Sequence, residues 1–134
     1  MSVQAADKLK DKFGDTVLDT IEFRGETTVV VKKEDIVAVC AFLKEELGFN
    51  FLTDLCGVDY MGQDPRFMVV YHLYNIGTHT RLRIKAPVEE SDTRIDTVSG
   101  VWTTADWMER ETWDLMGITF NNHPDPRRIL MPDD

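Results

Sequence analysis

The chain has 134 residues, of which 43% are hydrophobic and 29% are charged, and its formal net charge is −9 at neutral pH. That length corresponds to one domain, and the apolar fraction is ordinary for a globular protein, so the composition excludes a wholly disordered chain. The acidic balance argues against a free-standing nucleic-acid-binding protein and against electrostatic attachment to anionic lipid, since both need a basic surface. A soluble enzyme or a component of a larger assembly remains.

Two cysteines, Cys40 and Cys56, are too few for a disulfide framework, and each lies in an apolar run, as expected of buried reduced thiols. The sequence has no Cys-x-x-Cys pair, which argues against an iron–sulfur cluster or a zinc site held by this chain alone. No apolar run approaches the ~18 residues of a membrane-spanning helix. The N-terminus lacks the basic and apolar segments of a signal peptide. We therefore expect a cytosolic-type domain.

The first half of the chain alternates between helical and strand periodicity. Apolar residues at three- and four-residue steps indicate amphipathic helices, and Gly14 and Gly48 stop them. Strand-like runs flank a short turn that contains Gly25. The elements predicted in chain order are a helix over residues 3–13, strands over 16–23 and 27–31, a helix over 34–47 and a buried strand over 52–60.

A β-hairpin is predicted next, with strands over residues 67–74 and 79–86. In this register Tyr74 faces His79 and His72 faces Arg81, and side-chain alternation separates two faces. The basic face suits either a solvated surface or a surface that binds a partner. The core face comprises Phe67, Val69, Tyr71, Leu73, Leu82, Ile84 and Ala86, and the basic face comprises Met68, Val70, His72, Tyr74, His79, Arg81, Arg83 and Lys85.

The last third of the chain predicts one helix and then an irregular tail. Pro87 is expected to end the hairpin, and an acidic loop follows over residues 89–92. The helix spans residues 104–116, with Thr103 and Asp106 as a capping-box variant and Gly117 as its stop. Three prolines in the last eleven residues argue against regular structure there.

The order α-β-β-α-β-β-β-α predicts a two-layer α+β fold, in which helices cover one face of a mixed β-sheet. We expect one domain over residues 1–117. Residues 118–134 are predicted to form an extended C-terminal segment that packs on the domain or on a partner.

The two sides of the last helix differ in character. The stripe expected to pack on the sheet comprises Ala105, Met108, Thr112, Leu115 and Met116. The opposite side carries Trp107, Arg110, Glu111 and Asp114. A tryptophan among charges is typical of a protein interface, although a solvated helix could also carry it. Arg110 is spaced to pair with Asp106 and Asp114.

The tail carries two adjacent arginines, Arg127 and Arg128, which can form bidentate pairs with carboxylates. The partner carboxylates could be Glu111 or Asp114 of this chain, or those of a neighbour. The prolines around the arginines lower the entropy cost of ordering on a partner.

A small acid–base or metal-dependent hydrolase is an alternative, because Glu111, Asp114 and His123 could supply the groups that it needs. However, no carboxylate is followed three residues later by a histidine, and the histidines share no ligand spacing with the cysteines. The sequence also lacks a glycine-rich phosphate-binding loop. From the residues alone we predict an α+β domain with candidate binding faces and no self-contained active site.

The C-terminal pattern resembles the thirty-kilodalton subunit family of proton-pumping NADH:quinone oxidoreductase, respiratory complex I. That signature is Glu-Arg-Glu, two residues, an acidic residue, two apolar residues, six residues, His, three residues, Arg, one residue and two aliphatics. The resemblance extends over nearly the whole chain, with further likeness in residues 55–60, 70–74, 81–83 and 101–102. The matching residues are Glu109, Arg110, Glu111, Asp114, Leu115, Met116, His123, Arg127, Ile129 and Leu130.

The resemblance implies a subunit of the peripheral arm, on the cytoplasmic side of the cell membrane, that holds no cofactor. It would pack beside the large hydrogenase-like subunit and near the subunit with the terminal iron–sulfur cluster. Electrons would pass from NADH to quinone through FMN and clusters in other subunits, coupled to proton translocation.

The resemblance also implies which residues lie at subunit contacts, but it does not decide between complex I and related complexes. The signature's charged residues, with Arg128, would lie at subunit contacts, and the possible partner faces would be those of Trp107 and of the basic hairpin residues His72, Arg81, Arg83 and Lys85. Equivalent subunits of membrane-bound hydrogenase, formate hydrogenlyase and F420H2 dehydrogenase complexes are the alternative. Family members commonly continue beyond Pro132-Asp133-Asp134, where this sequence ends.

Overall fold

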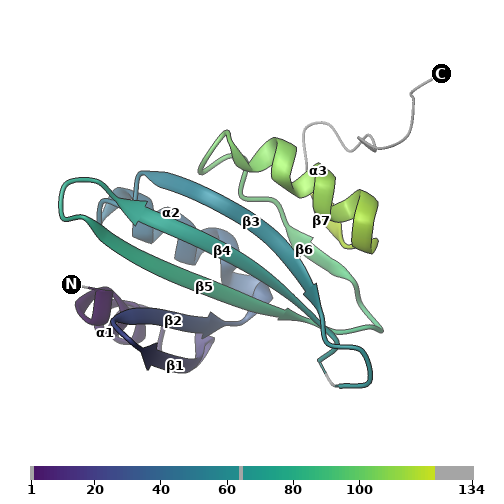
Figure 1. Cartoon of the computed structure of the whole chain (residues 1–134), viewed down its shortest axis with the longest axis horizontal. Coiled ribbons are helices and arrows are strands. Elements are labelled where there is room, and N and C mark those ends of the chain that lie inside the picture. Colours follow the sequence, from purple (N-terminus) through teal and green to yellow (C-terminus); the bar gives the residue numbers. More distant parts are fainter. Residues whose placement is uncertain (1, 64, 123–134) are drawn as a thin grey trace.

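A computed structural model describes residues 2–63 and 65–122 of the chain. A five-stranded mixed sheet has the strand order β1-β2-β5-β4-β3, and a separate pair is formed by β6 and β7 (Figure 1). The helices are α1 (Ser2–Phe13), α2 (Ile36–Glu45) and α3 (Ala105–Met116), with short 3-10 turns η1 (Gly14–Thr16) and η2 (Lys33–Asp35). The strands are β1 (Val17–Phe23), β2 (Glu26–Val31), β3 (Phe51–Asp59), β4 (Phe67–Asn75), β5 (Thr80–Val88), β6 (Arg94–Asp96) and β7 (Thr119–Asn121).

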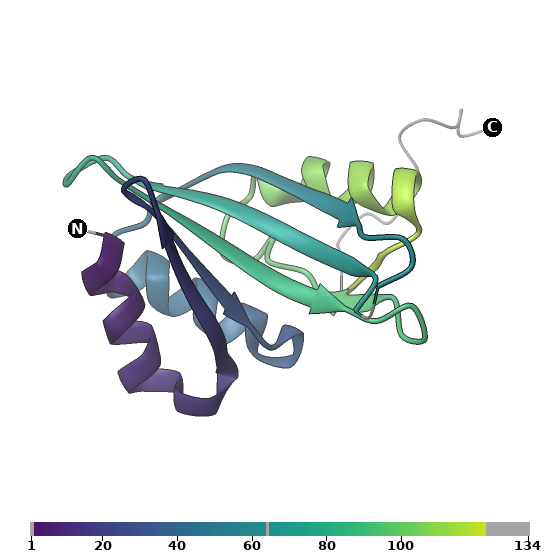
Figure 2. The same ribbon diagram turned by 60° about the horizontal axis from the view of Figure 1, so that its bottom comes forward.

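All three helices pack on the same face of the large sheet, which confirms the predicted α+β class. Helices α1 and α2 lie together on one side of the strands (Figure 2). Helix α3 packs against Gly57 of β3, and Gly57 pairs with the buried Val69 of β4. Paired residues of antiparallel strands point to the same side, so α3 covers the face that α1 and α2 cover. The opposite face, called the open face below, has no described helix on it.

The hairpin of β4 and β5 supplies the centre of the core, and every residue of its predicted core face is buried. Its register differs from the prediction by two residues, because Tyr74 pairs with Arg81 and His72 pairs with Arg83. The difference arises because His79 adopts a positive φ of 53° within a four-residue loop. Each side chain keeps its predicted face, since faces alternate with a period of two residues.

Strand β5 continues through Pro87 to Val88, so the prediction that Pro87 ends the strand is wrong. Proline removes one backbone donor, which a strand tolerates on a side where it has no neighbour. Strand β2 pairs with β5 only between Arg83 and Lys85, so β5 has a single neighbouring strand at Pro87.

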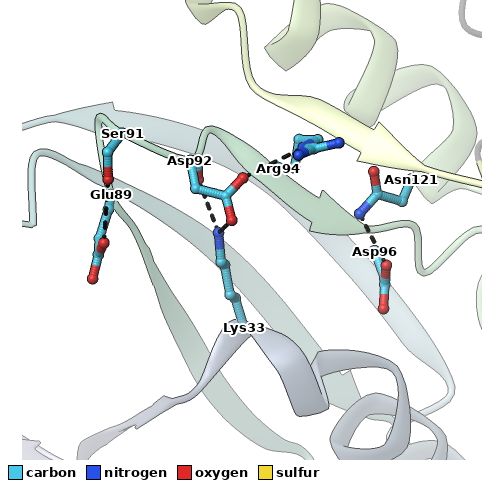
Figure 3. A network of polar contacts seen from close by, with 7 residues as sticks. All are labelled: Lys33, Glu89, Ser91, Asp92, Arg94, Asp96 and Asn121. Carbon is cyan, nitrogen blue, oxygen red and sulfur yellow. Dashed lines mark hydrogen bonds and ion pairs between the residues drawn. The ribbon is translucent and has the colours of Figure 1, made fainter.

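The acidic loop and the small sheet are joined by a polar network (Figure 3). Lys33 Nζ donates to the carbonyl oxygen of Asp92 at 2.8 Å and lies 3.1 Å from its carboxylate. Arg94 also contacts the Asp92 carboxylate, and Asn121 donates to Asp96 at 3.2 Å across the β6–β7 pair. The contacts link η2 through Asp92 to β6, and β6 to β7, two strands that the sequence did not predict.

Residues 119–121, at the start of the predicted C-terminal segment, form a regular strand, so the irregular structure predicted there is wrong. Thr119–Asn121 form β7, parallel to β6, and Ile118 and Phe120 are buried in the core. The rest of the predicted tail lies outside the described residues. Among the residues that the structure describes, no helix is long and apolar enough to cross a membrane.

Candidate functional site

Helix α3, which carries the first half of the signature, lies beside β3 (Figure 1). Its C-terminus is closed by Gly117, whose φ of 76° allows its N–H to donate to the Trp113 carbonyl at 2.8 Å. At its other end the buried indole of Trp102 donates to the Phe49 carbonyl at 3.1 Å. The first bond ends the helix, and the second ties the segment before α3 to the segment before β3, which positions the helix beside the sheet.

The predicted capping box at the start of α3 is not formed. Thr104 is the N-cap residue, and it makes no side-chain cap bond within the described chain. The Asp106 N–H donates to the carbonyl of Thr103 at 3.2 Å, which satisfies this backbone donor without a side-chain acceptor.

The inner face of α3 is narrower than predicted. Ala105 and Thr112 are buried, but Leu115 is 67% exposed. The helix presents its centre to Gly57, where an added Cβ would lie 2.4 Å from Met116 Sδ and 3.1 Å from Thr112 Cγ2. Successive residues of a helix are about 100° apart, so Leu115 lies about 100° from Met116, outside the contact.

Glu109 also belongs to the inner face of α3, although the apolar pattern of the sequence did not place it there. Its side chain is 0% exposed, and its carboxylate accepts hydrogen bonds from the Thr97 hydroxyl and from the Val98 N–H, the latter at 2.8 Å. A carboxylate is buried in proteins when it is paired or hydrogen-bonded. The contacts described for this signature residue are therefore internal and attach α3 to the segment after β6. Its predicted place at a subunit contact remains a prediction.

The outer face of α3 combines apolar and charged groups. Trp107 is 54% exposed, and the guanidinium of Arg110 lies 5.0 Å from the centroid of its ring. Arg110 Nε also lies 3.6 Å from an oxygen of Asp106, which confirms one of the two predicted i,i+4 pairs. Glu111 is exposed beside them. Trp107, Glu111 and Leu115 together make an apolar and acidic surface, which we call the α3 outer face.

The open face of the sheet carries the basic residues of the hairpin. Arg81 is exposed, whereas Lys85 and Arg83 are partly buried. Arg83 donates to the Glu26 carboxylate at 3.3 Å and to Thr28 Oγ1 at 3.4 Å. Part of the predicted basic charge is therefore neutralised within the chain.

A shallow groove of about 480 Å³ runs over the open face, lined by residues that include Glu26, Asp54, His72, Tyr74, Arg81 and Arg83. Its lining combines the acidic side chains Glu26 and Asp54 with the basic side chains Arg81 and Arg83. Burial, and next the charge of Arg83, lowers the pKa of His72. The shift favours the neutral imidazole, whose unprotonated nitrogen can accept a hydrogen bond.

The structure also gathers three residues that sequence spacing did not connect. Asp54 pairs with His72 across β3 and β4, and Cys56 follows Asp54 by two residues on the same face. Their metal-binding atoms all lie within 4.8 Å of one another. A search for ligand spacing along the chain misses such a group, since the pairing of two strands brings it together.

The residues of the hydrolase alternative are not assembled within the described chain. Glu111 and Asp114 lie on α3, and His123 falls outside the described residues. Arg127 and Arg128, predicted to pair with carboxylates, also fall outside them.

A family comparison identifies the chain. The model of the family described as "Respiratory-chain NADH dehydrogenase, 30 Kd subunit" matches residues 29–134. The chain belongs to this family of complex I subunits. The resemblance seen in the signature is thereby confirmed.

Curated relatives of this complex I subunit support the same family. It is 64% identical over 131 residues to the NADH-quinone oxidoreductase C subunit of Geotalea uraniireducens, an alignment that covers 98% of this chain and 80% of the relative. It is 61% identical over 132 residues to the protein of the same name in Geobacter metallireducens, covering 98% and 82%.

Two solved structures share the fold of this complex I subunit. A trypsin-resistant fragment of Nqo5 is 32% identical, with a TM-score of 0.82, over 93% of this chain and 99% of the fragment. A chain from a membrane-bound sulfane sulfur reductase, an archaeal respiratory membrane complex, has a TM-score of 0.81 at 21% identity, over 98% of this chain and 77% of that one. At that identity the likeness shows the fold alone.

Proposed function

We propose that this chain is a non-catalytic structural subunit of the peripheral arm of NADH:quinone oxidoreductase. It supports electron transfer from NADH to quinone, coupled to proton translocation, by holding other subunits in place. The chain belongs to the 30-kDa subunit family, and the observation that carries the proposal is the contrast between the two faces of its helix α3. Its inner face anchors the helix through Glu109, while Trp107 and Leu115 are displayed to solvent.

The α3 outer face has the composition of a contact surface. Aromatic anchors surrounded by polar groups dominate the binding energy of protein interfaces. Trp107 and Leu115 are exposed large apolar side chains on one short helix, with Glu111 between them. We propose that this surface meets the large hydrogenase-like subunit or the subunit with the terminal iron–sulfur cluster, on the cytoplasmic side of the membrane.

The redox groups of the complex are proposed to lie in other subunits. An iron–sulfur cluster is commonly held by four cysteine thiolates, and the whole sequence contains two cysteines. Cys40 is buried inside the domain, whereas Cys56 lies on the open face of the sheet. The two thiols are therefore placed on different sides of the sheet, which supports a chain that holds no iron–sulfur cluster of its own.

The assembly test replaces the apolar anchors of the α3 outer face. The Trp107→Ala, Leu115→Ser double variant is expected to unfold at the same urea concentration as the native chain, because both side chains are exposed. In cells it should enter the complex poorly and lower membrane NADH:quinone reductase activity. Met61→Ser is the matched control, since Met61 is an exposed apolar residue in the loop between β3 and β4, outside the α3 outer face.

Two results would overturn the proposal. One is normal incorporation and activity of the double variant, which would remove the α3 outer face as a contact. The other is stoichiometric flavin or iron in the purified chain, which would contradict a structural role.

The alternative is an equivalent subunit of a related hydrogenase-type, formate hydrogenlyase or F420H2-oxidising complex. The fold that the chain shares with a subunit of an archaeal respiratory membrane complex is compatible with it. Co-purification separates the two: an NADH-binding subunit supports complex I, and a nickel–iron hydrogenase subunit supports the alternative.

A further inference from the structure

The three residues gathered on the open face of the sheet belong to two rigid, paired strands. A β-bulge between Leu52 and Asp54 shifts the register of β3, so that Leu52 and Leu55 both enter the core. Asp54 and Cys56 consequently both face the open side, where His72 of β4 lies opposite Asp54. The Thr53 hydroxyl donates to the His72 carbonyl at 3.0 Å and adds a cross-strand bond at the same place.

The ligand atoms are close enough to share one ion. They lie within 4.8 Å of one another. A tetrahedral zinc ion with bonds of about 2.0–2.3 Å separates its ligand atoms by about 3.3–3.8 Å. Small side-chain rotations on a fixed backbone therefore suffice to bring a thiolate, an imidazole and a carboxylate into one coordination sphere.

The donors also suit a particular class of ion. A combination of sulfur, nitrogen and oxygen ligands favours borderline ions such as Zn²⁺ over Mg²⁺ or Ca²⁺, which prefer oxygen alone. The Leu55 N–H donates to one oxygen of Asp54 at 2.9 Å, which orients the carboxylate and leaves the second oxygen for the ion.

The cluster lies among charges of both signs, because Arg83 and Lys85 of β5 and Glu26 of β2 act on His72 together with Asp54. Arg83 neighbours His72, but its guanidinium donates toward β2, to Glu26 and Thr28. The Cys56 thiol would release its proton to solvent as the ion binds, and the resulting thiolate and the Asp54 carboxylate would balance the two charges of the ion. Asp54 and His72 line the groove, so a fourth coordination position would open onto it.

We propose that Asp54, Cys56 and His72 form a binding site for a divalent ion of the zinc type, with three protein ligands and a fourth position open to solvent. The site goes beyond the proposed structural role, and it departs from the expectation that the chain holds no metal. It lies on the open face of the sheet, whereas α3 covers the other face.

The test uses the full chain, stripped of metal with a chelator, and Co²⁺ as a spectroscopic probe of the zinc-type site. Co²⁺ should produce a thiolate-to-metal charge-transfer absorption that saturates at one ion per chain, and Zn²⁺ should displace it. Cys56→Ser should abolish the absorption. His72→Gln and Asp54→Asn should each weaken Co²⁺ binding at least roughly tenfold, since even outer-shell partners contribute that much.

His79→Gln and Cys40→Ala are the matched controls, because His79 is exposed in the loop of the same hairpin and Cys40 is buried in α2. Both should keep the native spectrum and affinity. Circular dichroism establishes that each variant is folded, and Asp54→Asn, at an exposed position, provides a second variant should Cys56→Ser fail to fold. Absence of the thiolate absorption in the native chain would overturn the proposal, as would native affinity in the folded His72→Gln and Asp54→Asn variants.

Discussion

Replacing Glu109 by alanine tests whether this signature residue stabilises the domain itself. The side chain is fully buried, and its carboxylate accepts hydrogen bonds from the Thr97 hydroxyl and the Val98 N–H. Alanine would leave both donors without this acceptor in the interior and would open a cavity beneath α3. We therefore expect a large loss of folding stability in the isolated chain.

The magnitude follows from the described bonds. A hydrogen bond to a charged group contributes about 1.5–3 kcal/mol, so the two bonds to Glu109 amount to about 3–6 kcal/mol. The cost of burying a carboxylate disappears in the variant and offsets part of this loss. The expected net decrease in the free energy of unfolding is about 2–4 kcal/mol. Glu109→Gln keeps one acceptor oxygen and should lose about half as much.

Urea unfolding followed by tryptophan fluorescence measures the effect. With a denaturant slope of about 2 kcal/mol per molar, Glu109→Ala should lower the midpoint by about 1–2 M. Glu111→Ala, on the exposed side of the same helix, is the matched control and should leave the midpoint within about 0.3 M of the native value. A Glu109→Ala midpoint equal to that of Glu111→Ala would refute the internal role of Glu109.

Three further predictions concern groups in other parts of the fold. The hydroxyl of Tyr71 is buried without a hydrogen-bond partner among the described residues. Tyr71→Phe should therefore leave the free energy of unfolding unchanged or raise it by up to about 1–3 kcal/mol, measured from the urea midpoint. Burial, and next the charge of Glu109, raises the pKa of Cys40, so its thiol should resist Ellman's reagent until the chain unfolds. The hydrogen bond from Arg66 lowers the pKa of Asp59, so this pair stabilises the fold above about pH 4 and ceases to do so as the pH falls through the lowered pKa.

Each of these predictions has a result that contradicts it. A destabilised Tyr71→Phe would show that the hydroxyl has a partner in solution. Labelling of Cys40 as fast as that of Cys56 in the native chain would show that α2 opens readily. For the ion pair, an NMR titration should show a higher pKa for Asp59 in Arg66→Gln, and an unchanged pKa would exclude the pairing.

The hairpin shows how far periodicity alone can reach. Alternation along residues 67–86 correctly predicted every buried side chain on its core face, because side-chain direction in a strand depends only on sequence parity. The register was wrong by two residues, because it depends on the loop conformation around His79. The error left both faces intact, so the basic residues of the open face could be named correctly.

The end of the chain shows where local reasoning stops. Strands β6 and β7 have three residues each and lie on opposite sides of α3 in the sequence. Neither has enough alternation to predict a strand, and each forms only because the other supplies its backbone partners. The burial of Glu109 has the same origin, since its donors come from the segment that follows β6.

Length, charge, periodicity and one signature determined the class of fold, the family and the two faces of the hairpin, because these depend on residue types and their spacing. The tertiary structure decided which side of α3 is buried, that Glu109 anchors this helix, and that Asp54, Cys56 and His72 meet on the open face. Those features depend on a bulge, on strand pairing and on the approach of α3 to Gly57, all of which join residues distant in the chain.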